Sequence, residues 1–319
     1  MAFRIEQIPI LYEDDEILVL NKPAGISVIP ERYEEGELSL LELLTIRGEP
    51  SGAQNLNLTE LLSTSHGFSG WESPGDQNLK AAELRNQGGA VDKKKHPWLR
   101  CQDPRQYNSV PQEPLGTDLS IPLGSFVRPV HRIDKETSGV VLFAKTEEAF
   151  RGLSLQFQER TLTKIYHALV EGRPGWVEQN CDVPLRVDGD RRHRTIVHRE
   201  GKPSRTFLKV LETFRGFALV EAQPKTGRTH QIRVHLSYLG HPIVGDALYR
   251  GGEGLFLSAF KRGYVANVLG TEKPLIRRTA LHALSLEFTH PRTGEHLRFE
   301  APYPKDLAIA LKQLRRYGK

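Results

Sequence analysis

The chain of 319 residues contains only two cysteines, Cys101 and Cys181, which is too few for a disulfide framework or for a zinc site with four cysteine ligands. No apolar run approaches the roughly 18 residues that are needed to span a bilayer. The first residues, MAFRIEQIPILYEDDEI, lack the basic start and the uninterrupted apolar core of a signal peptide. We therefore expect a cytoplasmic protein with no membrane partner.

The signatures of common metal and cofactor enzymes are also missing. There is no His-Glu-x-x-His motif, and His230 and His235 are five residues apart, so they do not share one face of a helix. The sequence has no Walker loop, no dinucleotide fingerprint and no Gly-x-Ser-x-Gly elbow, which argues against nucleotide cofactors and against a serine hydrolase. We predict a site that uses neither a metal nor a cofactor.

Charge is present but unevenly distributed. The formal net charge is +5 and the isoelectric point is about 9.1. Residues 1–47 carry four Lys and Arg against ten Asp and Glu, whereas residues 186–233 carry twelve against five. Clustered cations favour a polyanionic partner such as RNA, although a solvated face that keeps the protein soluble has the same composition.

Hydrophobic periodicity predicts an α+β fold, with a central mixed or antiparallel sheet flanked by helices and loops. Helical patterns occur at residues 38–46, 147–160, 228–240 and 306–318. Strand patterns occur at residues 10–12, 17–20, 139–146 and 164–172, and repeatedly within 185–222 and 280–302. No internal repeat is visible.

A polar insertion interrupts this pattern and sets the domain boundaries. Residues 48–124 are rich in Gly, Pro, Ser, Asn and Gln, which predicts a loop-rich or partly disordered insertion within one catalytic domain formed by residues 1–47 and 125–319. Short helices are predicted near LTELLS and LKAAELR. The basic segment KKKHPWLR, residues 93–100, is suited to hold RNA by charge and stacking, or is a solvated loop with one anchoring aromatic.

The stretch HRIDKETSG, residues 131–139, places Asp134 among cationic neighbours. Nearby positive charge favours the ionised carboxylate, which makes Asp134 available as a nucleophile or base. Ion pairing of this kind is also common in purely structural networks, so the residues alone leave both interpretations open.

Two further positions are candidates for the same site. Arg228 lies in KTGRTHQIRVH at the predicted start of a helix, where a guanidinium is unfavourable for the helix itself. We expect it to point at a carboxylate or a phosphate, with a tolerated surface arginine as the alternative. Tyr166, on a predicted strand, is either a half-buried aromatic or a plate for a flipped base whose phenol can join in proton transfer.

Taken together, five stretches resemble the RluA-type (ribosomal large-subunit type) pseudouridine synthase family, in the order and character of its motifs. The resemblance covers residues 10–45 and 126–316, and it rests on LNKPAG, HRIDKETSGVVLFAKT, YHALVEG, TGRTHQIRVHLSYLGHPIVGDALY and RTALHALSLEFTHPRTGEHLRFEAP. It implies the pseudouridine synthase fold and an isomerase that detaches uracil from its ribose, rotates it and rejoins it through carbon 5. Such chemistry requires no metal or cofactor.

The resemblance also implies roles for individual residues. Asp134 matches the catalytic Asp, Arg228 the Arg that pairs with it, and Tyr166 the Tyr that stacks on the target base and takes part in removing the proton from carbon 5. Candidate RNA-binding residues are Arg132, Lys135, Lys164, Arg191, Arg192, Arg194, His230 and Arg233. Motif residues expected to have structural roles are Lys22, Pro23, Gly25, His131, Thr137, Ser138, Gly139 and Gly227. The sequence starts at the first strand of the catalytic domain, without the alpha-L-type RNA-binding domain of many relatives, so we expect RNA targeting to come from the catalytic domain or the insertion.

The predicted partner is structured RNA whose target uridine is flipped out of its stack. Large-subunit ribosomal RNA is favoured, with transfer RNA as the alternative, and the protein is expected to act as a monomer. A catalytically silent RNA-binding or ribosome-assembly protein would have no need to keep Asp134, Tyr166 and Arg228 together. A sugar-hydrolysing enzyme would require a second carboxylate beside the first.

Overall fold

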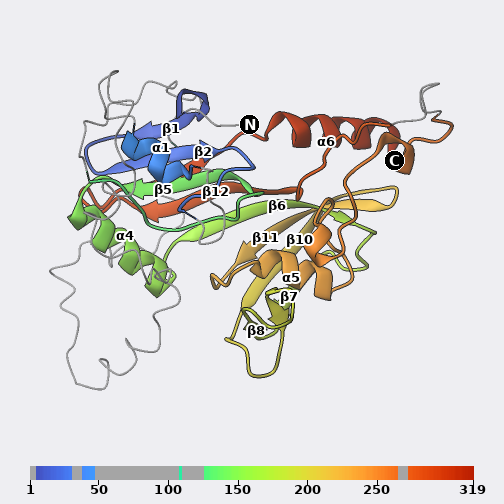
Figure 1. Cartoon of the computed structure of the whole chain (residues 1–319), viewed down its shortest axis with the longest axis horizontal. Helices are drawn as coiled ribbons and strands as arrows, with labels where there is room; N and C mark the ends of the chain where they lie inside the picture. The colour runs from blue at the N-terminus through green and yellow to red at the C-terminus, as the bar shows by residue number, and fades with distance from the viewer. Residues whose placement is uncertain (1–4, 31–37, 47–107, 110–125, 265–271) are drawn as a thin grey trace.

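A computed structural model describes residues 5–30, 38–46, 108–109, 126–264 and 272–319 (Figure 1). Apart from residues 108–109, the predicted insertion 48–124 lies outside the described residues, and so do its predicted short helices and the basic segment KKKHPWLR. Within the described ranges, no helix is both long and apolar enough to cross a membrane.

One mixed sheet of eleven strands organises the described residues (Figure 1). Its main path runs through β1 (Ile10–Glu13), β2 (Ile17–Lys22), β5 (Ser138–Ala144), β12 (Leu281–Thr289), β6 (Thr163–Glu171), β11 (Phe217–Pro224), β10 (Arg205–Phe214) and β7 (Glu178–Asp182). Strands off this path are β4 (Arg128–Pro129) beside β5, β13 (His296–Glu300) beside β12, and β3 (Asn108–Ser109) beside β13. Pairing is antiparallel except between β5 and β12 and between β13 and β3. The predicted α+β fold is confirmed.

The described helices lie where the sequence predicts them, namely α1 (Leu40–Ile46), α4 (Glu147–Glu159), α5 (Gln231–Tyr238) and α6 (Lys305–Tyr317). Single turns of 3-10 helix occur at η1 (Ile5–Gln7), η3 (Ala247–Tyr249) and η4 (Leu257–Ala259). Helix α4 begins after Thr146, whose side chain accepts a hydrogen bond from the Ala149 amide at 3.1 Å. Helix α5 begins later than predicted, because the residues before Gln231 form a turn in which His230 takes a left-handed φ of 54°.

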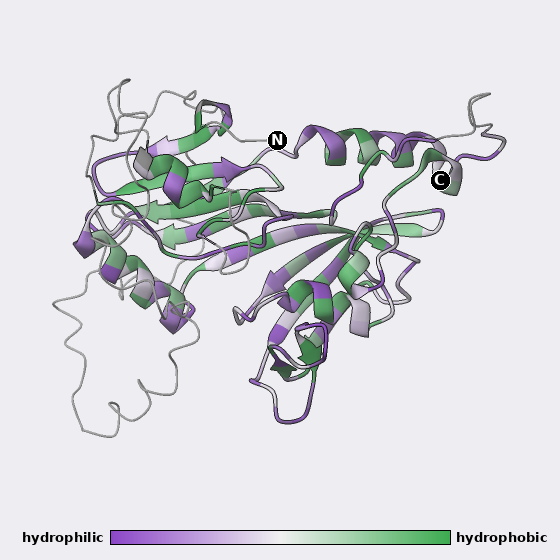
Figure 2. Cartoon of the chain, viewed as in Figure 1, coloured by the Kyte–Doolittle hydropathy of each residue, from purple (hydrophilic) through white to green (hydrophobic). Residues whose placement is uncertain are grey.

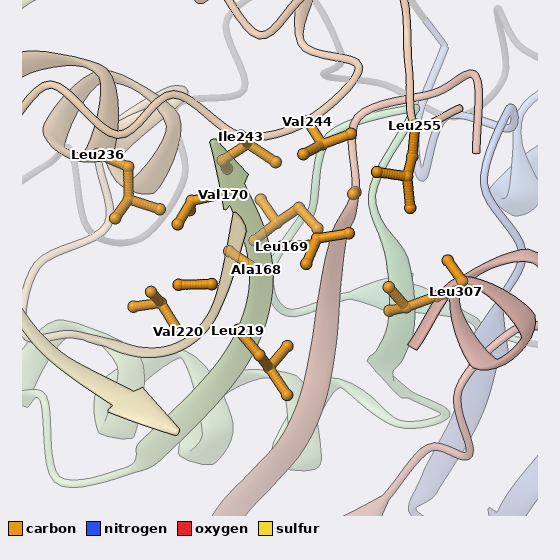
Figure 3. Close-up of a cluster of buried hydrophobic side chains, with 14 of the residues drawn as sticks. Ala168, Leu169, Val170, Leu219, Val220, Leu236, Ile243, Val244, Leu255 and Leu307 are labelled. Atoms are coloured by element: carbon orange, nitrogen blue, oxygen red, sulfur yellow. The ribbon is translucent and has the colours of Figure 1, made fainter. Parts of the chain in front are cut away.

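Both faces of β2 and β5 are buried, which explains their continuous apolar runs. Because side chains alternate along a strand, Leu18 and Leu20 pack in the cluster that contains α1, whereas Ile17 and Val19 pack in the cluster that contains α4. The third and largest cluster surrounds β6 and β11 (Figure 3), where residues of both strands pack with Leu236 of α5 and Leu307 of α6. Helix α6 carries hydrophobic and hydrophilic residues in alternation (Figure 2), and its buried residues are Leu307, Ala310, Leu311 and Leu314.

Gly139 permits a close approach of two parallel strands. Its φ is +117°, and a Cβ at this position would lie 2.1 Å from the backbone oxygen of Ala283, its register partner on β12. The structure therefore places Gly139, a motif residue with an expected structural role, against the neighbouring strand β12. Ser138 likewise contacts β12, with its hydroxyl 3.0 Å from His282 Nδ1.

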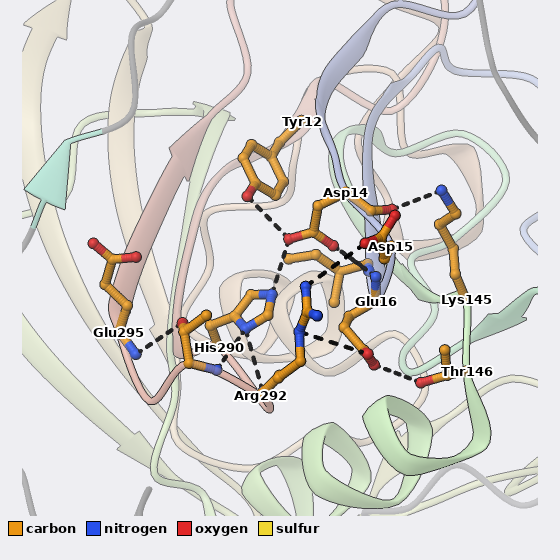
Figure 4. Close-up of polar contacts among 11 residues, drawn as sticks. Tyr12, Asp14, Asp15, Glu16, Lys145, Thr146, His290, Arg292 and Glu295 are labelled. Carbon is orange, nitrogen blue, oxygen red and sulfur yellow. Dashed lines mark hydrogen bonds and ion pairs between the residues drawn. The ribbon is translucent and has the colours of Figure 1, made fainter.

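A buried polar network ties the β1–β2 turn to the β12–β13 turn (Figure 4). Asp14 Oδ2 accepts from the Tyr12 hydroxyl and from His290 Nε2, both at 2.9 Å. His290 Nδ1 accepts from backbone amides, so the imidazole proton is on Nε2. Burial of Asp14 opposes ionisation, but these hydrogen bonds and two backbone amides outweigh it and lower the pKa of the carboxyl. These contacts join two turns of the sheet and lie outside the cavity described below, which indicates a structural role.

Candidate active site

A cavity of about 660 Å³ opens where the loops on either side of β6 converge. Three segments line it, residues 130–137 before β5, residues 157–166 from the end of α4 into β6, and residues 223–233 from β11 into α5. Because β6 lies between β12 and β11 in the middle of the sheet, it brings loops from both halves of the fold to one place. Asp134, Tyr166 and Arg228, predicted from distant stretches of sequence, all line this cavity.

The NKPAG stretch forms hydrogen bonds to the loop that carries Asp134. The Asp134 carbonyl accepts from the Thr137 amide at 3.0 Å, which closes a turn. The fully buried Lys22 donates through Nζ to the carbonyls of Pro23, Ile26 and Lys135, at 2.9, 2.7 and 3.0 Å. The Gly25 amide also donates to the Lys135 carbonyl, at 2.8 Å. These bonds fix the backbone on which Asp134 is mounted.

Asp134 is partly exposed and ionised. Arg233 Nη1 donates to its Oδ2 at 3.1 Å, and His230 Nε2 lies 3.9 Å from the same oxygen. Burial opposes the charged form, but the positive charges of His230 and Arg233 outweigh it and lower the pKa of Asp134. Burial also lowers the pKa of His230, so its positive charge contributes only at acidic pH. Near pH 7 the imidazole is neutral, and Arg233 supplies the compensating charge. Within the described residues, these contacts anchor Oδ2, no hydrogen bond reaches Oδ1, and Asp134 lines the cavity.

Arg233, rather than Arg228, is the partner of Asp134, which corrects the expected pairing. Arg233 projects from the first turn of α5, and its Nε and Nη2 bind Asp246 Oδ2 and Oδ1 at 2.7 and 2.9 Å. The bidentate contact aims the remaining nitrogen at Asp134. Arg228 precedes the helix, and its Nε donates to the Pro203 carbonyl at 3.3 Å, so it lies on the wall of the cavity in a different contact.

Two residues of this site were not identified from the sequence. Asp246 is 1% exposed and holds Arg233, and Tyr249 contacts both His230 and Arg233. Both belong to the stretch GHPIVGDALY. The available signal was a lone carboxylate in an apolar run, because a buried Asp almost always requires a cationic or hydrogen-bonding partner.

Tyr166 stands on β6 between two small residues, since its register partners are Ala222 on β11 and Ala283 on β12. These alanines leave its ring accessible to the cavity, which it lines. Burial and the negative charge of Asp134 raise the pKa of the phenol, so the hydroxyl stays protonated at neutral pH. This geometry suits an aromatic surface against which a planar base can stack.

The predicted RNA-binding and motif residues fall into different environments. Arg132 is exposed on the cavity wall. Lys164 also lines the cavity beside Gly227, and burial together with Arg160 lowers the pKa of its ammonium to about 8. His131 is buried, accepts from the Leu142 amide at 3.1 Å and stacks on Phe157; burial lowers its pKa to about 3, so the ring is neutral and structural.

The basic loop between β8 (Leu185–Arg186) and β9 (Ile196–Val197) contains two kinds of arginine. Arg191 and Arg192 are exposed. Arg194, expected to face RNA, instead pairs with Asp190 at 2.6 Å and donates to the Leu248 carbonyl at 3.1 Å. The latter bond fastens the loop beside the turn that contains Asp246 and Tyr249.

Comparison with known proteins finds one matching family model and several solved structures with a similar fold. The sequence model of the family described as RNA pseudouridylate synthase matches residues 91–238. Two solved human structures, RNA pseudouridylate synthase domain containing 1 and 4, superpose with TM-scores of 0.55 and 0.56 at 24% identity. They cover 95% and 96% of this chain and 86% and 93% of their own, and at this identity the likeness concerns the fold alone.

Closer relatives carry the same class name. An uncharacterized RNA pseudouridine synthase of Bacillus subtilis is 41% identical over 205 residues, 63% of this chain and 61% of the relative. The ribosomal large subunit pseudouridine synthase C of Escherichia coli K12 is 42% identical over 198 residues, 61% of this chain and 58% of the relative. The chain therefore spans less than two thirds of the length of these relatives. The match to this family model and the names of these relatives agree with the resemblance of its motifs to the RluA-type pseudouridine synthases.

Proposed function

We propose that this protein is an RNA pseudouridine synthase that isomerises uridines to pseudouridine in structured RNA, with large-subunit ribosomal RNA as the substrate. The observation that carries the proposal is the state of Asp134, an ionised carboxylate that is anchored through Oδ2 and lines a cavity large enough for a nucleotide. The names of relatives such as the Escherichia coli enzyme support the choice of ribosomal RNA.

The reaction needs no redox or hydrolytic step. The bond between N1 of uracil and C1′ of ribose breaks, the base turns, and a bond forms between C5 and C1′. The hydrogen on C5 leaves as a proton, and N1 gains one, so atoms and charge balance. Asp134 Oδ1 is placed to attack the nucleotide or to accept a ribose proton, while Arg233 keeps the carboxylate charged and oriented through Oδ2.

Binding follows from the walls of the cavity. A uridine within a helix cannot reach Asp134, so it must leave its stack, and the ring of Tyr166 offers a replacement stacking surface. Arg132, Lys164 and Arg228 line the same cavity and can neutralise the phosphates on either side of the flipped nucleotide. The protonated state of the Tyr166 phenol favours stacking as its main contribution, with proton acceptance requiring simultaneous transfer onward.

The proposal is tested by mapping pseudouridine across the RNA of cells that lack the protein, with rescue by the wild type or by Asp134→Asn. We expect a few ribosomal RNA positions to lose pseudouridine and only the wild type to restore them. Loss confined to transfer RNA would support the other substrate. Restoration by Asp134→Asn, or no change at any site, would contradict the catalytic assignment and leave a silent RNA-binding protein as the explanation.

A further inference from the structure

Tyr249 lies beside the candidate site and has no role in the reaction proposed above. It lies in η3, is 6% exposed, and its hydroxyl is a hub between two segments of the chain. The backbone amide of Thr195 donates to this hydroxyl at 3.1 Å, and His230 Nδ1 lies 2.9 Å from it. Because the amide can only donate, the hydroxyl accepts from Thr195, and its own hydrogen is available for His230 Nδ1.

When the Tyr249 hydroxyl donates to Nδ1, this arrangement selects one tautomer of His230. An imidazole whose Nδ1 accepts a hydrogen bond carries its proton on Nε2 when neutral. Nε2 lies 3.9 Å from Asp134 Oδ2, the oxygen that Arg233 also binds. His230 itself has a left-handed φ of 54° and no side-chain cap, so the Tyr249 hydroxyl is the contact that sets the direction of its ring.

Tyr249 also contacts the second group that faces Asp134. The guanidinium carbon of Arg233 lies 5.0 Å from the centroid of the Tyr249 ring. The Tyr249 amide donates to Asp246 Oδ1 at 3.3 Å, and Asp246 holds Arg233 through its bidentate contact. One residue therefore touches both Arg233, which donates to Asp134 Oδ2, and His230, whose Nε2 lies 3.9 Å from the same oxygen.

We propose that Tyr249 is a positioning residue for the isomerisation, which keeps the Nε2 proton of His230 directed at Asp134 Oδ2 and thereby leaves Oδ1 as the reacting oxygen. The inference rests on the proposed function. Thr195 lies at the end of the basic loop between β8 and β9, so the same hydroxyl ties that loop to the catalytic carboxylate. An RNA that moves this loop on binding would act on Asp134 through Tyr249.

The test is Tyr249→Phe, which removes the hydroxyl and keeps the ring. The assay is tritium release from transcribed large-subunit ribosomal RNA labelled at C5 of uridine, measured from pH 5 to pH 9. We expect kcat to fall about 3- to 10-fold with KM within twofold of wild type, as for the loss of one hydrogen bond. The acid limb of the kcat profile should move up by about half a pH unit or more, because Asp134 loses part of its stabilising donor set.

A double-mutant cycle separates positioning from general damage. If Tyr249 acts through His230, then Tyr249→Phe should add little further loss in a His230→Ala background. Tyr238→Phe is the matched control, since Tyr238 is 57% exposed on the outer face of α5, and it should match wild type. The inference is overturned if Tyr249→Phe keeps the wild-type kcat and pH profile, or if its effect is equally large without His230.

Nitrogen-15 NMR of histidine-labelled wild-type protein provides a readout that needs no folded Tyr249 variant. We expect His230, identified by its absence from the His230→Ala spectrum, to carry its proton on Nε2; a proton on Nδ1 would overturn the inference. Wild-type protein that releases no tritium from ribosomal or transfer RNA would overturn the proposed function and this inference with it. Active wild type with inactive Asp134→Asn and fully active Tyr249→Phe would refute the inference alone.

Discussion

Replacing Arg233 with glutamine should separate the two carboxylates that it joins and weaken both stability and catalysis. The Arg233 side chain is 10% exposed and that of Asp246 is 1% exposed, so the mutation leaves a buried carboxylate without its cation. Breaking a buried pair in this way costs about 3–5 kcal/mol of unfolding free energy. Asp134, at 25% side-chain exposure, loses one charge-assisted hydrogen bond worth about 1.5–3 kcal/mol, which raises its pKa by about one to two units.

The direction of the pH effect follows from the lowered pKa of Asp134 in the intact protein. Wild-type activity needs the ionised carboxylate, which persists down to low pH, whereas in Arg233→Gln the acid limb of the kcat profile should move upward by the same one to two units. The remaining deficit above pH 8 reports misorientation rather than protonation. Urea unfolding measures the stability change in the same variant.

Arg228→Gln is the matched control, because Arg228 lines the same cavity but donates to a backbone carbonyl. We expect it to leave the pH profile of kcat unchanged and to raise KM for RNA. The reasoning is refuted if Arg233→Gln keeps the wild-type profile, or if Arg228→Gln is the variant whose acid limb shifts.

Three further perturbations follow from the structure. Gly139→Ala should lower the unfolding free energy by at least about 2 kcal/mol in urea titrations, because its Cβ would collide with the Ala283 carbonyl; wild-type stability would contradict the close approach. Burial lowers the pKa of three histidines to about 3, 4 and 4, namely His131, His235 and His282. Below about pH 6.5 the unfolded chain binds protons at these histidines and the folded chain does not. The unfolding free energy should therefore fall from pH 6.5 towards pH 4, by about 2 kcal/mol per histidine at pH 5. Equal unfolding free energies at pH 7 and pH 5 would refute this. Replacing the exposed loop residues Arg191 and Arg192 with alanine should lower the slope of log Kd for RNA against log salt concentration by about two, with kcat within twofold of wild type. An unchanged slope would show that this loop does not contact the RNA.

Local patterns were sufficient to predict most of the described elements. The run of apolar residues in β5 and the capping Thr146 mark the passage from strand to α4, since both signals act within a few residues. The turn at residues 291–294 likewise separates β12 from β13 as the sequence predicts. What the patterns did not specify is the order of strands in the sheet, such as the parallel pairing of β5 with β12, because that order depends on contacts between residues more than a hundred positions apart.

In the candidate site too, some residues could be predicted from local sequence and others only from contacts in the fold. Asp134 and Tyr166 were predicted as site residues from residue type and from motifs in their immediate neighbourhood, and the fold places both at one cavity. The buried Lys22 was recognisable as part of a motif, but its three carbonyl partners come from two separate loops and needed the structure.

The choice between Arg228 and Arg233 shows why the remainder was inaccessible from the sequence. Both arginines lie in one stretch of six residues, 228–233. The pairing of Arg228 with Asp134 was implied by the family resemblance, whereas the argument from the helix start left a tolerated surface arginine as the alternative. The helix instead begins at Gln231, so Arg228 belongs to the preceding turn and Arg233 to the first turn of α5. Which arginine reaches Asp134 is then decided by Asp246, thirteen residues beyond Arg233. Its two oxygens bind Nε and Nη2 of Arg233 and leave Nη1 for the Asp134 carboxylate. Asp246, to which the sequence analysis assigned no role, thus determines that Arg233 and not Arg228 pairs with Asp134.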